Sequence, residues 1–434
     1  MNTAAKHIVI VGGGAGGAEL ATRLGNTLGK KKLAQITLID ANRTHIWKPR
    51  LHEVAAGMLD AGSNELSYVA HAHQHHFNFV LGAMCGIDRE NKRLLLAPLT
   101  DQDEEIQPAR GIDYDILVVA VGSQTNDFNT KGAKDHCIYL DKREAAEAFH
   151  HAFLNVYLKA SKVNNKDDEH FNIAIVGAGA TGVELAADLD HTADQLMHYG
   201  FDGIKPENVK ITIVEAGPRV MPALSEKTSM AIRRQLESLD IDILTGQMVT
   251  EVTADGLHTK DGQFIPARLK VWSAGIKSWD FLSEIEGLET NRIHQLIVKP
   301  SLQCSNDDNI FAMGDCSSCI LEGEERPLPP RAQTANQQAT FLAKQITALI
   351  QGKPLKSFVY KDKGSLISLS KAGSVGSIMG NLSKDFTFEG RMARFFYISL
   401  YRLHQATLHG WFNTLLLILR DRINKRTGPK MKLH

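Results

Sequence analysis

A thirteen-residue stretch occurs twice in this chain, and the repeat constrains the fold more than any other feature of the sequence. The first copy reads IVIVGGGAGGAEL from Ile8 to Leu20, and the second reads IAIVGAGATGVEL from Ile173 to Leu185. Nine of the thirteen positions are identical, and the copies start 165 residues apart. Each copy opens with a four-residue apolar run, which is typical of a strand buried on both faces of a parallel sheet. The sequence therefore predicts the same supersecondary unit at two places.

The glycines of both copies follow the spacing G-x-G-x-x-G. In the first copy, Gly12 allows the tight turn, Gly14 lets a pyrophosphate approach the backbone, and Gly17 packs helix against strand. We expect the helix to begin with Ala18 and Glu19. The phosphates then lie at the helix N-terminus, where free N–H groups and the helix dipole favour anions. The second copy has the same three glycines, Gly177, Gly179 and Gly182.

An acid closes the strand that follows each glycine motif. The strand Ile36 to Ile39 ends in Asp40, 23 residues after Gly17, and the strand Ile211 to Val214 ends in Glu215. A carboxylate at this place binds the ribose hydroxyls of a dinucleotide. One glycine motif alone is a weak indication, but the combination of strand, glycines, helix and acid occurs twice. The sequence therefore indicates a flavin enzyme supplied by a nicotinamide.

Glu215 and a third acid, Asp315, refine this interpretation. Glu215 would bind both ribose hydroxyls and repel a 2′-phosphate, so we expect NADH rather than NADPH, although Arg219 nearby leaves NADPH open. The segment Asn309 to Met313 reads as a short strand that ends in Gly314-Asp315. Its carboxylate would lie at the carboxyl edge of a sheet, where ligands bind in α/β folds.

Composition excludes several classes of protein. The 434 residues are 43% hydrophobic, with 49 Lys plus Arg against 49 Asp plus Glu, so no global charge indicates nucleic acid. Five cysteines form no even disulfide framework, which fits a reducing compartment. The first strand starts too early for a signal peptide, and no apolar run approaches the roughly 20 residues that span a bilayer. We expect a cytoplasmic protein that does not cross a membrane.

With GGGAGG, GAGATG and IFAMGDC, the chain resembles the flavoproteins with two dinucleotide-binding domains, a group that includes glutathione reductase and ferredoxin reductases. Two further segments, Leu117 to Ser123 and Val271 to Ile276, match the crossovers between the domains of such proteins. The resemblance implies that the first glycine motif holds FAD and that Asp315 contacts its ribityl chain. Thiol-disulfide reductases of this group carry a C-x-x-x-x-C pair, and this chain has no cysteine between Asp40 and Met84.

A closer resemblance is to the bacterial type II NADH:quinone oxidoreductases, respiratory enzymes that do not pump protons. It rests on WKPRLHEVAAG around Lys48, on GVELAA from Gly182, and on Pro329-Pro330-Arg331 followed by AQTANQ. The last segment fits the A-Q-x-A-x-Q motif of the quinone site. The resemblance implies hydride transfer from NADH to non-covalent FAD, then transfer of two electrons to a membrane quinone, ubiquinone or menaquinone. It also implies a peripheral enzyme at the cytoplasmic face of the bacterial inner membrane.

These considerations give the predicted site residues. Glu184, Gln333 and Gln337 are the predicted catalytic residues: the resemblance places Glu184 by the nicotinamide–flavin contact, whereas Glu19 keeps mainly a role in the nucleotide domain. Gln333 and Gln337 are spaced i, i+4 and share one side of a helix that we expect Pro329 and Pro330 to start. Amides donate hydrogen bonds to quinone carbonyls without adding charge to an apolar pocket. The predicted cofactor-binding residues are Gly12, Gly13, Gly14, Gly16, Gly17, Asp40, Lys48, Gly122, Asp315, Ala332, Gln333, Gly177, Gly179, Gly182, Glu184, Glu215 and Gly275.

Other interpretations remain at this point. A sulfide:quinone reductase would need two redox cysteines beside the flavin, and only Cys137 and Cys304 are loosely placed for that. A redox-sensing flavoprotein, in which NADH controls assembly, would show turnover of only a few per second or less. The histidines of HAHQHH, from His71 to His76, and the pair Cys316 and Cys319 suggest metal, but neither group has the further ligands that a structural zinc site needs. We therefore predict no metal.

The C-terminal arm differs from the rest of the chain. From Arg391 onward it contains nine Lys or Arg residues and one acid, Asp421, for a formal charge of +8. Basic amphipathic helices with aromatic residues lie flat in a membrane interface, so we expect attachment to an anionic lipid surface. A helix pair packed on the body or a homodimer contact would explain the apolar residues but not the basic excess. The two apolar stripes are Met392, Phe396, Leu400 and Leu403, and Trp411, Phe412, Leu415, Leu416, Leu419 and Ile423.

The predicted fold class is α/β, with two Rossmann-like dinucleotide-binding domains, the second inserted in the first, and a C-terminal helical region that associates with a membrane. The predicted domains are 1–122 and 277–350 for FAD, the second part carrying the quinone-site helix, and 169–276 for NADH. Residues 123–168 would connect the two domains. Ser161 to Glu169 would form a solvated linker before the second domain. Residues 351–434 would form the C-terminal region.

Overall fold

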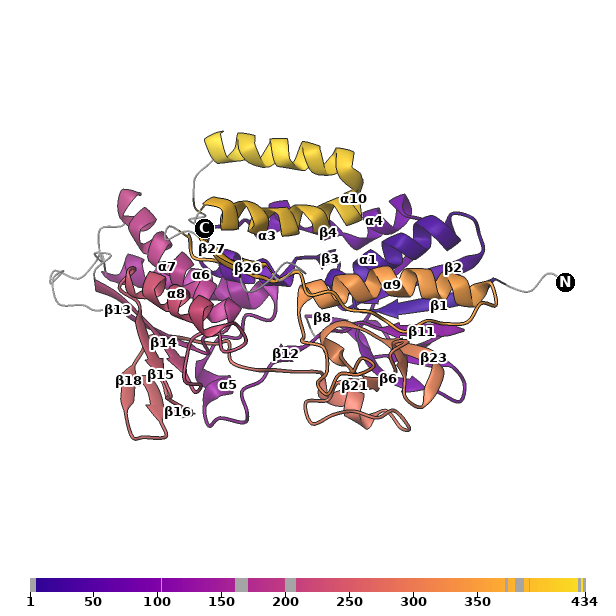
Figure 1. Cartoon of the computed structure of the whole chain (residues 1–434), viewed down its shortest axis with the longest axis horizontal. Coiled ribbons are helices and arrows are strands. Elements are labelled where there is room, and N and C mark those ends of the chain that lie inside the picture. The colour runs from indigo at the N-terminus through magenta and orange to yellow at the C-terminus, as the bar shows by residue number, and fades with distance from the viewer. Residues whose placement is uncertain are drawn as a thin grey trace. The chain divides into compact units, whose positions relative to one another are not determined.

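A computed structural model describes residues 5–102, 104–160, 171–199, 208–370, 374–378, 386–389, 391–427 and 431, coloured along the chain in Figure 1. The chain divides into two compact units. Unit 1 comprises Met1–Trp47, Asn64–Gln124 and Ile276–Lys361, and unit 2 comprises Lys48–Ser63, Thr125–Gly275 and Asp362–His434. The predicted linker from Ser161 to Glu169 lies outside the described residues.

Unit 1 is built on one large sheet with the strand order β24-β21-β22-β23-β11-β1-β2-β5. The strands from β23 to β5 are parallel, and β1 is the central strand of this parallel part. Residues Ile8 to Val11 of β1 are almost fully buried, as expected for a strand covered on both faces. The strands of this sheet are β1 (Lys6–Val11), β2 (Ala34–Asp40), β5 (Asn78–Leu81), β11 (Ile116–Val119), β21 (Leu296–Val298), β22 (Gln303–Cys304), β23 (Asp307–Ala312) and β24 (Ser317–Cys319).

Unit 2 contains a parallel four-stranded sheet with the order β15-β14-β13-β19. This order repeats that of β5-β2-β1-β11 in unit 1, with β13 in the place of β1. The strands of the second sheet lie in sequence between β11 and β23 of the first, so the predicted insertion of one Rossmann-like unit in another is confirmed. Its strands are β13 (Phe171–Val176), β14 (Val209–Glu215), β15 (Asp242–Thr245) and β19 (Leu269–Trp272).

The helix after each glycine motif starts earlier than predicted. Helix α1 runs over Ala15–Leu24 and helix α7 over Ala180–His198, so each helix begins inside its motif, directly after the second glycine. Glu19 and Glu184 are therefore the fifth residues of their helices rather than members of the first turn. Both side chains are buried, with relative exposures of 0% and 5%. Solvated acids at a helix N-terminus would not be buried to this extent, so these two glutamates need specific partners.

Each unit also carries smaller elements around its sheet, among them an antiparallel three-stranded sheet, β10-β7-β6 in unit 1 and β16-β17-β18 in unit 2. The smaller elements of unit 1 are η1 (Gly25–Gly29), β3 (Thr44–His45), β4 (Leu66–Ser67), α4 (Tyr68–Gln74), β6 (Met84–Asp88), β7 (Arg93–Leu96), β8 (Leu99–Asp101), β9 (Glu104–Gln107), β10 (Arg110–Asp113), β20 (Ile276–Lys277), η4 (Asp280–Glu284), η5 (Gly314–Cys316) and α9 (Ala332–Ile350). Those of unit 2 are η2 (Lys48–Arg50), α2 (Leu51–Ala55), α3 (Ala61–Asn64), α5 (Ala133–His136), α6 (Arg143–Ala160), α8 (Glu226–Glu237), β16 (Val249–Val252), β17 (Gly256–Thr259), β18 (Phe264–Pro266), β25 (Ser365–Ser368), β26 (Ser374–Ile378) and β27 (Phe386–Glu389), and β12 (Gln124–Thr125) follows β11.

The last helix, α10 (Arg391–Thr427), is a pair of helical segments rather than one rod. Gly410 has non-helical angles (φ 78°, ψ 160°), and the chain folds back there, as the two yellow helices in Figure 1 show. Arg402 of the first segment forms an ion pair with Asp421 of the second, with 2.7 Å between nitrogen and oxygen. Among the described helices, none combines the length and apolarity needed to traverse a bilayer.

Candidate functional site

The first glycine motif forms a tight turn between β1 and α1. Gly12 has φ +100° and its N–H donates to the carbonyl of Ile39 on the neighbouring strand at 2.8 Å. A Cβ at Gly12 would lie 2.3 Å from the carbonyl oxygen of Ala120, so no larger residue fits. At Gly14 an added Cβ would meet no described atom within 4 Å, so this backbone is open to a ligand. The turn therefore has the close packing and the open backbone that a bound pyrophosphate requires.

The second glycine motif repeats this geometry in unit 2. Gly177 has φ +105° and donates to the carbonyl of Val214 at 2.8 Å. A Cβ there would lie 2.7 Å from the backbone nitrogen of Ala274, whereas at Gly179 it would face space with no described atom within 4 Å. A Cβ on Gly182 would approach the carbonyl oxygen of Gly177 to 2.1 Å, which explains the third glycine as the place where helix meets strand. The two motifs therefore form turns with the same backbone geometry.

The acids that close β2 and β14 also occupy equivalent positions. Asp40 accepts a hydrogen bond from the backbone N–H of Gly13 at 2.6 Å, and Glu215 accepts one from that of Ala178 at 2.7 Å. The second oxygen of each carboxylate accepts a backbone N–H two residues further along the chain, from Asn42 and Gly217. Each carboxylate is thus fixed beside its own phosphate turn. Burial raises the pKa of Asp40, and the hydrogen bonds from Gly13 and Asn42 oppose this shift.

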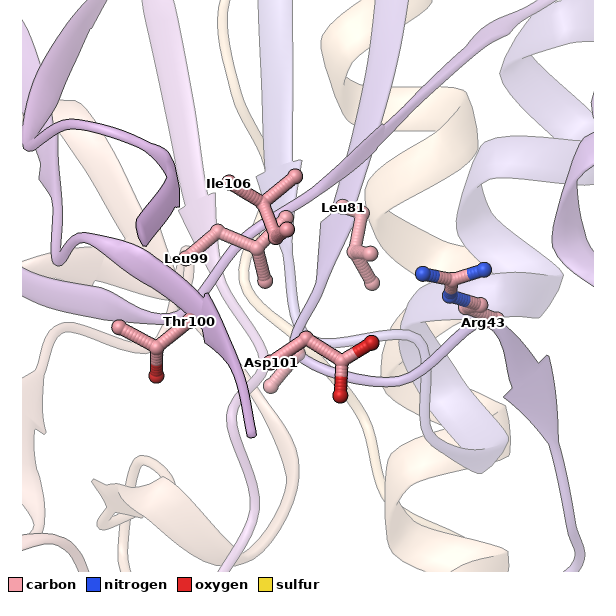
Figure 2. A pocket seen from close by; sticks show the side chains of 7 residues that line it. Arg43, Leu81, Leu99, Thr100, Asp101 and Ile106 are labelled. Carbon is pink, nitrogen blue, oxygen red and sulfur yellow. The ribbon is translucent and has the colours of Figure 1, made fainter. Parts of the chain in front are cut away.

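A pocket of about 370 Å³ opens in unit 1 beyond the end of β2. Arg43 lies across it from the apolar side chains of Leu99 and Ile106 (Figure 2). The remaining lining residues are Ala41, Leu81, Thr100 and Asp101. The pocket borders Ala41, directly after the predicted ribose-binding Asp40, and its mixed polar and apolar lining has room for the adenosine end of a dinucleotide. The residues of unit 1 therefore fit FAD, from the open backbone of the glycine turn to this pocket.

Asp315 is held in place on the short helix η5. Its side chain accepts a hydrogen bond from the hydroxyl of Ser123 at 3.0 Å, and its backbone carbonyl accepts one from the amide of Gln295 at 2.8 Å. The buried side chain of Gln338 on α9 accepts the N–H of Gly314 at 2.7 Å. Sequence reasoning did not select Gln338, although it adjoins the Gln337 of the motif. Its role is to fasten the Gly314-Asp315 turn to α9.

Helix α9 carries the predicted quinone-site residues but does not begin at the prolines. It starts at Ala332, with Arg331 in extended conformation before it, so Pro329 and Pro330 precede the helix and the expectation that they start it is wrong. Gln337 is already engaged, since its amide donates to the carbonyl of Lys361 at 2.9 Å and accepts the N–H of Lys361 at 3.0 Å. Gln333 is one turn earlier on the same side of the helix. To form a hydrogen bond with a quinone, Gln337 would have to give up its two hydrogen bonds with Lys361.

The two buried glutamates have different partners. Glu19 accepts hydrogen bonds from Arg23 at 2.8 Å, from Thr340 at 3.0 Å and from Asn336, and so joins α1 to α9. In unit 2, one oxygen of Glu184 accepts the N–H of Ser368 at 3.0 Å. The other lies 3.3 Å from a ring nitrogen of His52. Sequence reasoning placed Glu184 at the site but did not select His52 as a partner.

The remaining predicted cofactor residues lie at turns or bear ion pairs. Gly122 and Gly275 have φ of +69° and +68°, which explains glycine at both crossovers. Gly16 faces the methyl end of Met313, where an added Cβ would come within 2.3 Å. Lys48 lies on η2 and forms an ion pair with Asp141 at 2.8 Å. Its contact with a cofactor stays a prediction.

His71, Cys316 and Cys319 are buried in the packing of unit 1, whereas His73 and His76 are exposed. The Nε2 atom of His71, which is 1% exposed, lies 2.7 Å from the hydroxyl of Thr22. Within the described part of the chain, no three His, Cys, Asp or Glu side chains gather as metal ligands. Burial raises the pKa of the Cys316 thiol to about 12 and that of Cys319 to about 11, which keeps both in the unreactive thiol form.

The candidate site defines a class of protein. Two equivalent parallel sheets, each with an open glycine turn and an acid fixed beside it, form an oxidoreductase with two dinucleotide-binding domains. The chain belongs to the pyridine nucleotide-disulphide oxidoreductase family, whose model matches residues 6–339, and within that family to the type II NADH:quinone oxidoreductases.

Similarity to characterised relatives supports the assignment to this family. The chain is 47% identical over 444 aligned residues to the type II NADH:quinone oxidoreductase of Haemophilus influenzae, covering 99% of this chain and 100% of that protein. It is 32% identical over 381 residues to the enzyme of the same name from Staphylococcus aureus, covering 86% of this chain and 90% of that protein. Among solved structures, NDH2 from Plasmodium falciparum in complex with NADH shares the fold, with a TM-score of 0.84 at 20% identity, over 99% of this chain and 100% of that one.

Proposed function

We propose that this protein is an NADH:quinone oxidoreductase that passes electrons from NADH through FAD to a quinone. The observation that carries this conclusion is the duplicated dinucleotide unit in a chain 47% identical over its length to such an enzyme. A thiol route has no support in the cysteines, because burial raises the pKa of Cys137 and Cys304 to about 12 and disfavours the thiolates that a sulfide:quinone reductase needs.

FAD, held non-covalently, supplies the chemistry of a two-electron carrier when it is bound. In our assignment of unit 1, the turn from Gly12 to Gly17 binds its pyrophosphate, Asp40 its ribose and Asp315 its ribityl chain. In unit 2, the turn from Gly177 to Gly182 binds the pyrophosphate of NADH. Glu215, fixed by its two backbone hydrogen bonds, binds the ribose hydroxyls and repels a 2′-phosphate. The protein thus binds and orients, and no nucleophile is needed.

We assign quinone binding to the N-terminal part of α9. Ala332 and Gln333 lie in its first turn, where the positive end of the helix dipole favours the negative charge of a reduced flavin. Gln337 already holds Lys361 through two hydrogen bonds, so we test the assignment at Gln333. Gln333→Leu is expected to slow quinone reduction at least tenfold, because it removes one hydrogen bond to a polar substrate. Flavin reduction by NADH should stay as fast as in the parent protein.

Anaerobic half-reactions test the function directly. NADH added to the purified yellow protein should bleach the flavin absorbance, and a quinone added next should restore it. Ubiquinone and menaquinone analogues, tested in turn, identify the preferred acceptor. A protein whose flavin is not bleached by NADH, or is bleached but not reoxidised by either quinone, contradicts the proposal. Steady-state turnover of only a few per second would favour the NADH-sensing flavoprotein instead.

We further propose that the second segment of α10 attaches the enzyme to an anionic lipid surface at the cytoplasmic face of the inner membrane. Its large apolar side chains are half to three-quarters exposed. They are Trp411, Phe412, Leu415, Leu416, Leu419 and Ile423. Of the first apolar stripe, Leu403 is 42% exposed, and the side chains of Met392, Phe396 and Leu400 lie outside the described residues. The +8 charge of the arm complements anionic headgroups.

Vesicle binding tests the attachment. Trp411→Ser, Phe412→Ser and Leu415→Ser together should release the protein from vesicles that contain anionic phospholipid, while FAD content stays full. A matched control is Met197→Ser with Met230→Ser, two exposed apolar residues on other helices of unit 2. Equal vesicle binding by the triple variant and the parent would contradict the proposed attachment.

A further inference from the structure

Unit 2 contains a buried cluster of ionisable side chains that the proposed function leaves unexplained. His52 on α2 and Glu184 and Asp188 on α7 have relative exposures of 3%, 5% and 3%. Glu184 and Asp188 are four residues apart, so they share one face of α7. Two carboxylates this close would repel each other in a buried site unless a cation lies between them. The histidine ring supplies that cation.

Each ring nitrogen of His52 faces one carboxylate. Nδ1 lies 2.8 Å from Oδ2 of Asp188, and Nε2 lies 3.3 Å from Oε2 of Glu184. The Nδ1 contact with Asp188 is a hydrogen bond, whereas Nε2 lies within ion-pair distance of Glu184 without forming a hydrogen bond. Only the imidazolium form carries the positive charge that both carboxylates attract. The remaining oxygen of Glu184 accepts the N–H of Ser368 at 3.0 Å. Glu184 is thus held from one side by a backbone group and from the other by a cation.

We propose that His52 is the positioning residue of the second dinucleotide site, which fixes the orientation and the charge state of Glu184. The inference rests on the proposed function, since that function places Glu184 beside the nicotinamide. The nicotinamide ring becomes positive when NADH is oxidised, and an ionised Glu184 favours that charge. His52 acts through Glu184 and needs no contact with either nucleotide.

The direction of the pKa shifts agrees with this geometry. Burial lowers the pKa of His52, but Glu184 and Asp188 outweigh it, and the net pKa is about 9. Burial raises the pKa of Glu184 to about 7, although His52 and the Ser368 N–H act in the opposite direction. Burial also raises the pKa of Asp188, and the hydrogen bond from His52 opposes that shift. With His52 protonated and Asp188 ionised, the cluster carries one positive and two negative charges above the pKa of Glu184 and is neutral below it. It therefore exchanges one proton with solvent near neutral pH, and removal of His52 would raise the pKa of Glu184.

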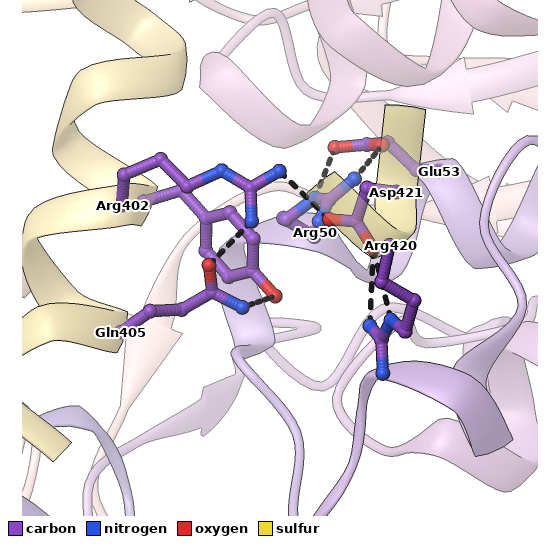
Figure 3. Close-up of polar contacts among 7 residues, drawn as sticks. Arg50, Glu53, Arg402, Gln405, Arg420 and Asp421 are labelled. Atoms are coloured by element: carbon purple, nitrogen blue, oxygen red, sulfur yellow. Dashed lines mark hydrogen bonds and ion pairs between the residues drawn. The ribbon is translucent and has the colours of Figure 1, made fainter. Parts of the chain in front are cut away.

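The other charged groups around the cluster have partners of their own. At the end of η2, Arg50 forms an ion pair with Glu53 of α2 at 2.6 Å and stacks over the Tyr401 ring of α10, where Arg402 also lies (Figure 3). Arg402 in turn pairs with Asp421. On α6, the buried ring of His150 packs against the α2 end near Gly57. From the segment after β25, Ser370 hydrogen-bonds Asp188. Arg50 is committed to Glu53, which leaves His52 as the counterion of Glu184.

Infrared pH titration of the oxidised holoenzyme tests the proposal without turnover. The protonated carboxyl band of Glu184 is identified by its loss in Glu184→Gln. In His52→Gln, the midpoint of that band should move upward by about one pH unit or more, the usual effect of losing an adjacent cation. In Asp188→Asn, which removes the neighbouring negative charge, it should move downward. The matched control is His71→Gln, a buried histidine of unit 1, for which the midpoint should not change.

Opposite shifts of the Glu184 midpoint in His52→Gln and Asp188→Asn distinguish a positioning role of His52 from a general loss of structure. General loosening of unit 2 would expose Glu184 and move its midpoint in the same direction in both variants, so equal directions overturn the proposal, as does an unchanged midpoint in His52→Gln. If His52→Gln does not fold with full FAD content, Asp188→Asn alone decides by the sign of its shift. Flavin reduction by NADH is measured separately: if it fails in the parent enzyme while the midpoints shift as expected, the function is wrong and the role of His52 stands.

Discussion

The two glycine turns have the same backbone but lie in different surroundings. Gly12 and Gly177 share their positive φ and donate to the equivalent carbonyl of the neighbouring strand. Asp40 and Glu215 accept the same two kinds of backbone N–H. The strand order around them is repeated as well. In our assignment, these shared features bind what all dinucleotides have in common, a pyrophosphate and a ribose.

The glutamate one turn into each helix shows where the copies diverge. Glu19 is tied to Asn336 and Thr340 of α9, so it joins the first turn to the helix that carries Gln333. Glu184 is tied to His52 and Ser368, and it belongs to a cluster that titrates near neutral pH. In our proposal, the glutamate thus joins two helices in one copy and controls charge at the nicotinamide in the other. The backbone defines which class of ligand binds, and the side chains around it define what each copy does with the ligand.

The largest effect is expected from Gly12→Ala and Gly177→Ala, which break one turn at a time. Each Cβ would collide with backbone, 2.3 Å from the Ala120 oxygen and 2.7 Å from the Ala274 nitrogen, at a φ that alanine rarely adopts. Gly12→Ala should lose FAD and purify colourless. Gly177→Ala should stay yellow but show at least a tenfold weaker affinity for NADH.

Flavin absorbance and NADH titration measure the two losses. Gly246→Ala provides a control in unit 2, because it also has positive φ but no described atom within 4 Å of an added Cβ, and lies outside both turns. Loss of FAD from both glycine variants, or from neither, would contradict the assignment of FAD to unit 1 and NADH to unit 2.

A smaller effect is expected at the acid of the second copy. Glu215→Ala removes the ribose acceptor and the charge that repels a 2′-phosphate. The KM for NADH should rise roughly 10- to 100-fold, the range for a hydrogen bond to a charged group, and discrimination against NADPH should fall. Arg219 would then be free to favour the phosphate only if it gave up its bonds to the carbonyls of Pro222 and Leu224. An unchanged NADH to NADPH ratio in steady-state kinetics would exclude Glu215 from specificity.

The buried glutamates should respond differently to the same conservative change. Glu184→Gln should slow flavin reduction by NADH and abolish its pH dependence. In the parent enzyme we expect that rate to fall as pH drops through about 7, because protonation removes the negative charge of Glu184. Glu19→Gln should leave the rate and its pH profile intact but lower the free energy of unfolding by about 1–3 kcal/mol, since it removes the partner of Arg23. Stopped-flow kinetics and thermal denaturation separate the two effects.

The sequence predicted the features that depend on short segments of chain. The strands, the glycine turns and the acids at the strand ends follow from local rules, because a parallel strand needs an apolar run and a tight turn needs glycine. Long-range partners did not follow. His52 meets Asp188 across 136 residues, and Glu19 meets Thr340 across 321. The i, i+4 spacing of Glu184 and Asp188 in an apolar helix was the one local indication of the buried cluster.

Helix boundaries were also less predictable than the turns. Glycines usually disfavour helices, so the motif read as a turn with a helix after it, whereas α1 and α7 begin inside it because their packing against the sheet outweighs the propensity of glycine. The helix α6 and the sheet β25-β26-β27 carry no comparable motif, and neither was predicted. The glycine turns and the acids beside them were therefore predictable, because a motif fixes their backbone. The helix starts and the buried partners were not, because tertiary packing determines them.

The smallest effect is expected at the buried cysteines, one near each sheet. Cys137 packs with Val176 and Trp272 in the core of unit 2, and Cys304 lies on β22 of unit 1. Cys137→Ala and Cys304→Ala should each lower stability by about 1 kcal/mol through lost packing. They should leave NADH oxidation and quinone reduction unchanged, because burial keeps both thiols protonated. If quinone reduction falls when both thiols are absent and the protein keeps its FAD, electrons pass through sulfur. The two dinucleotide-binding turns would then not be sufficient for the reaction.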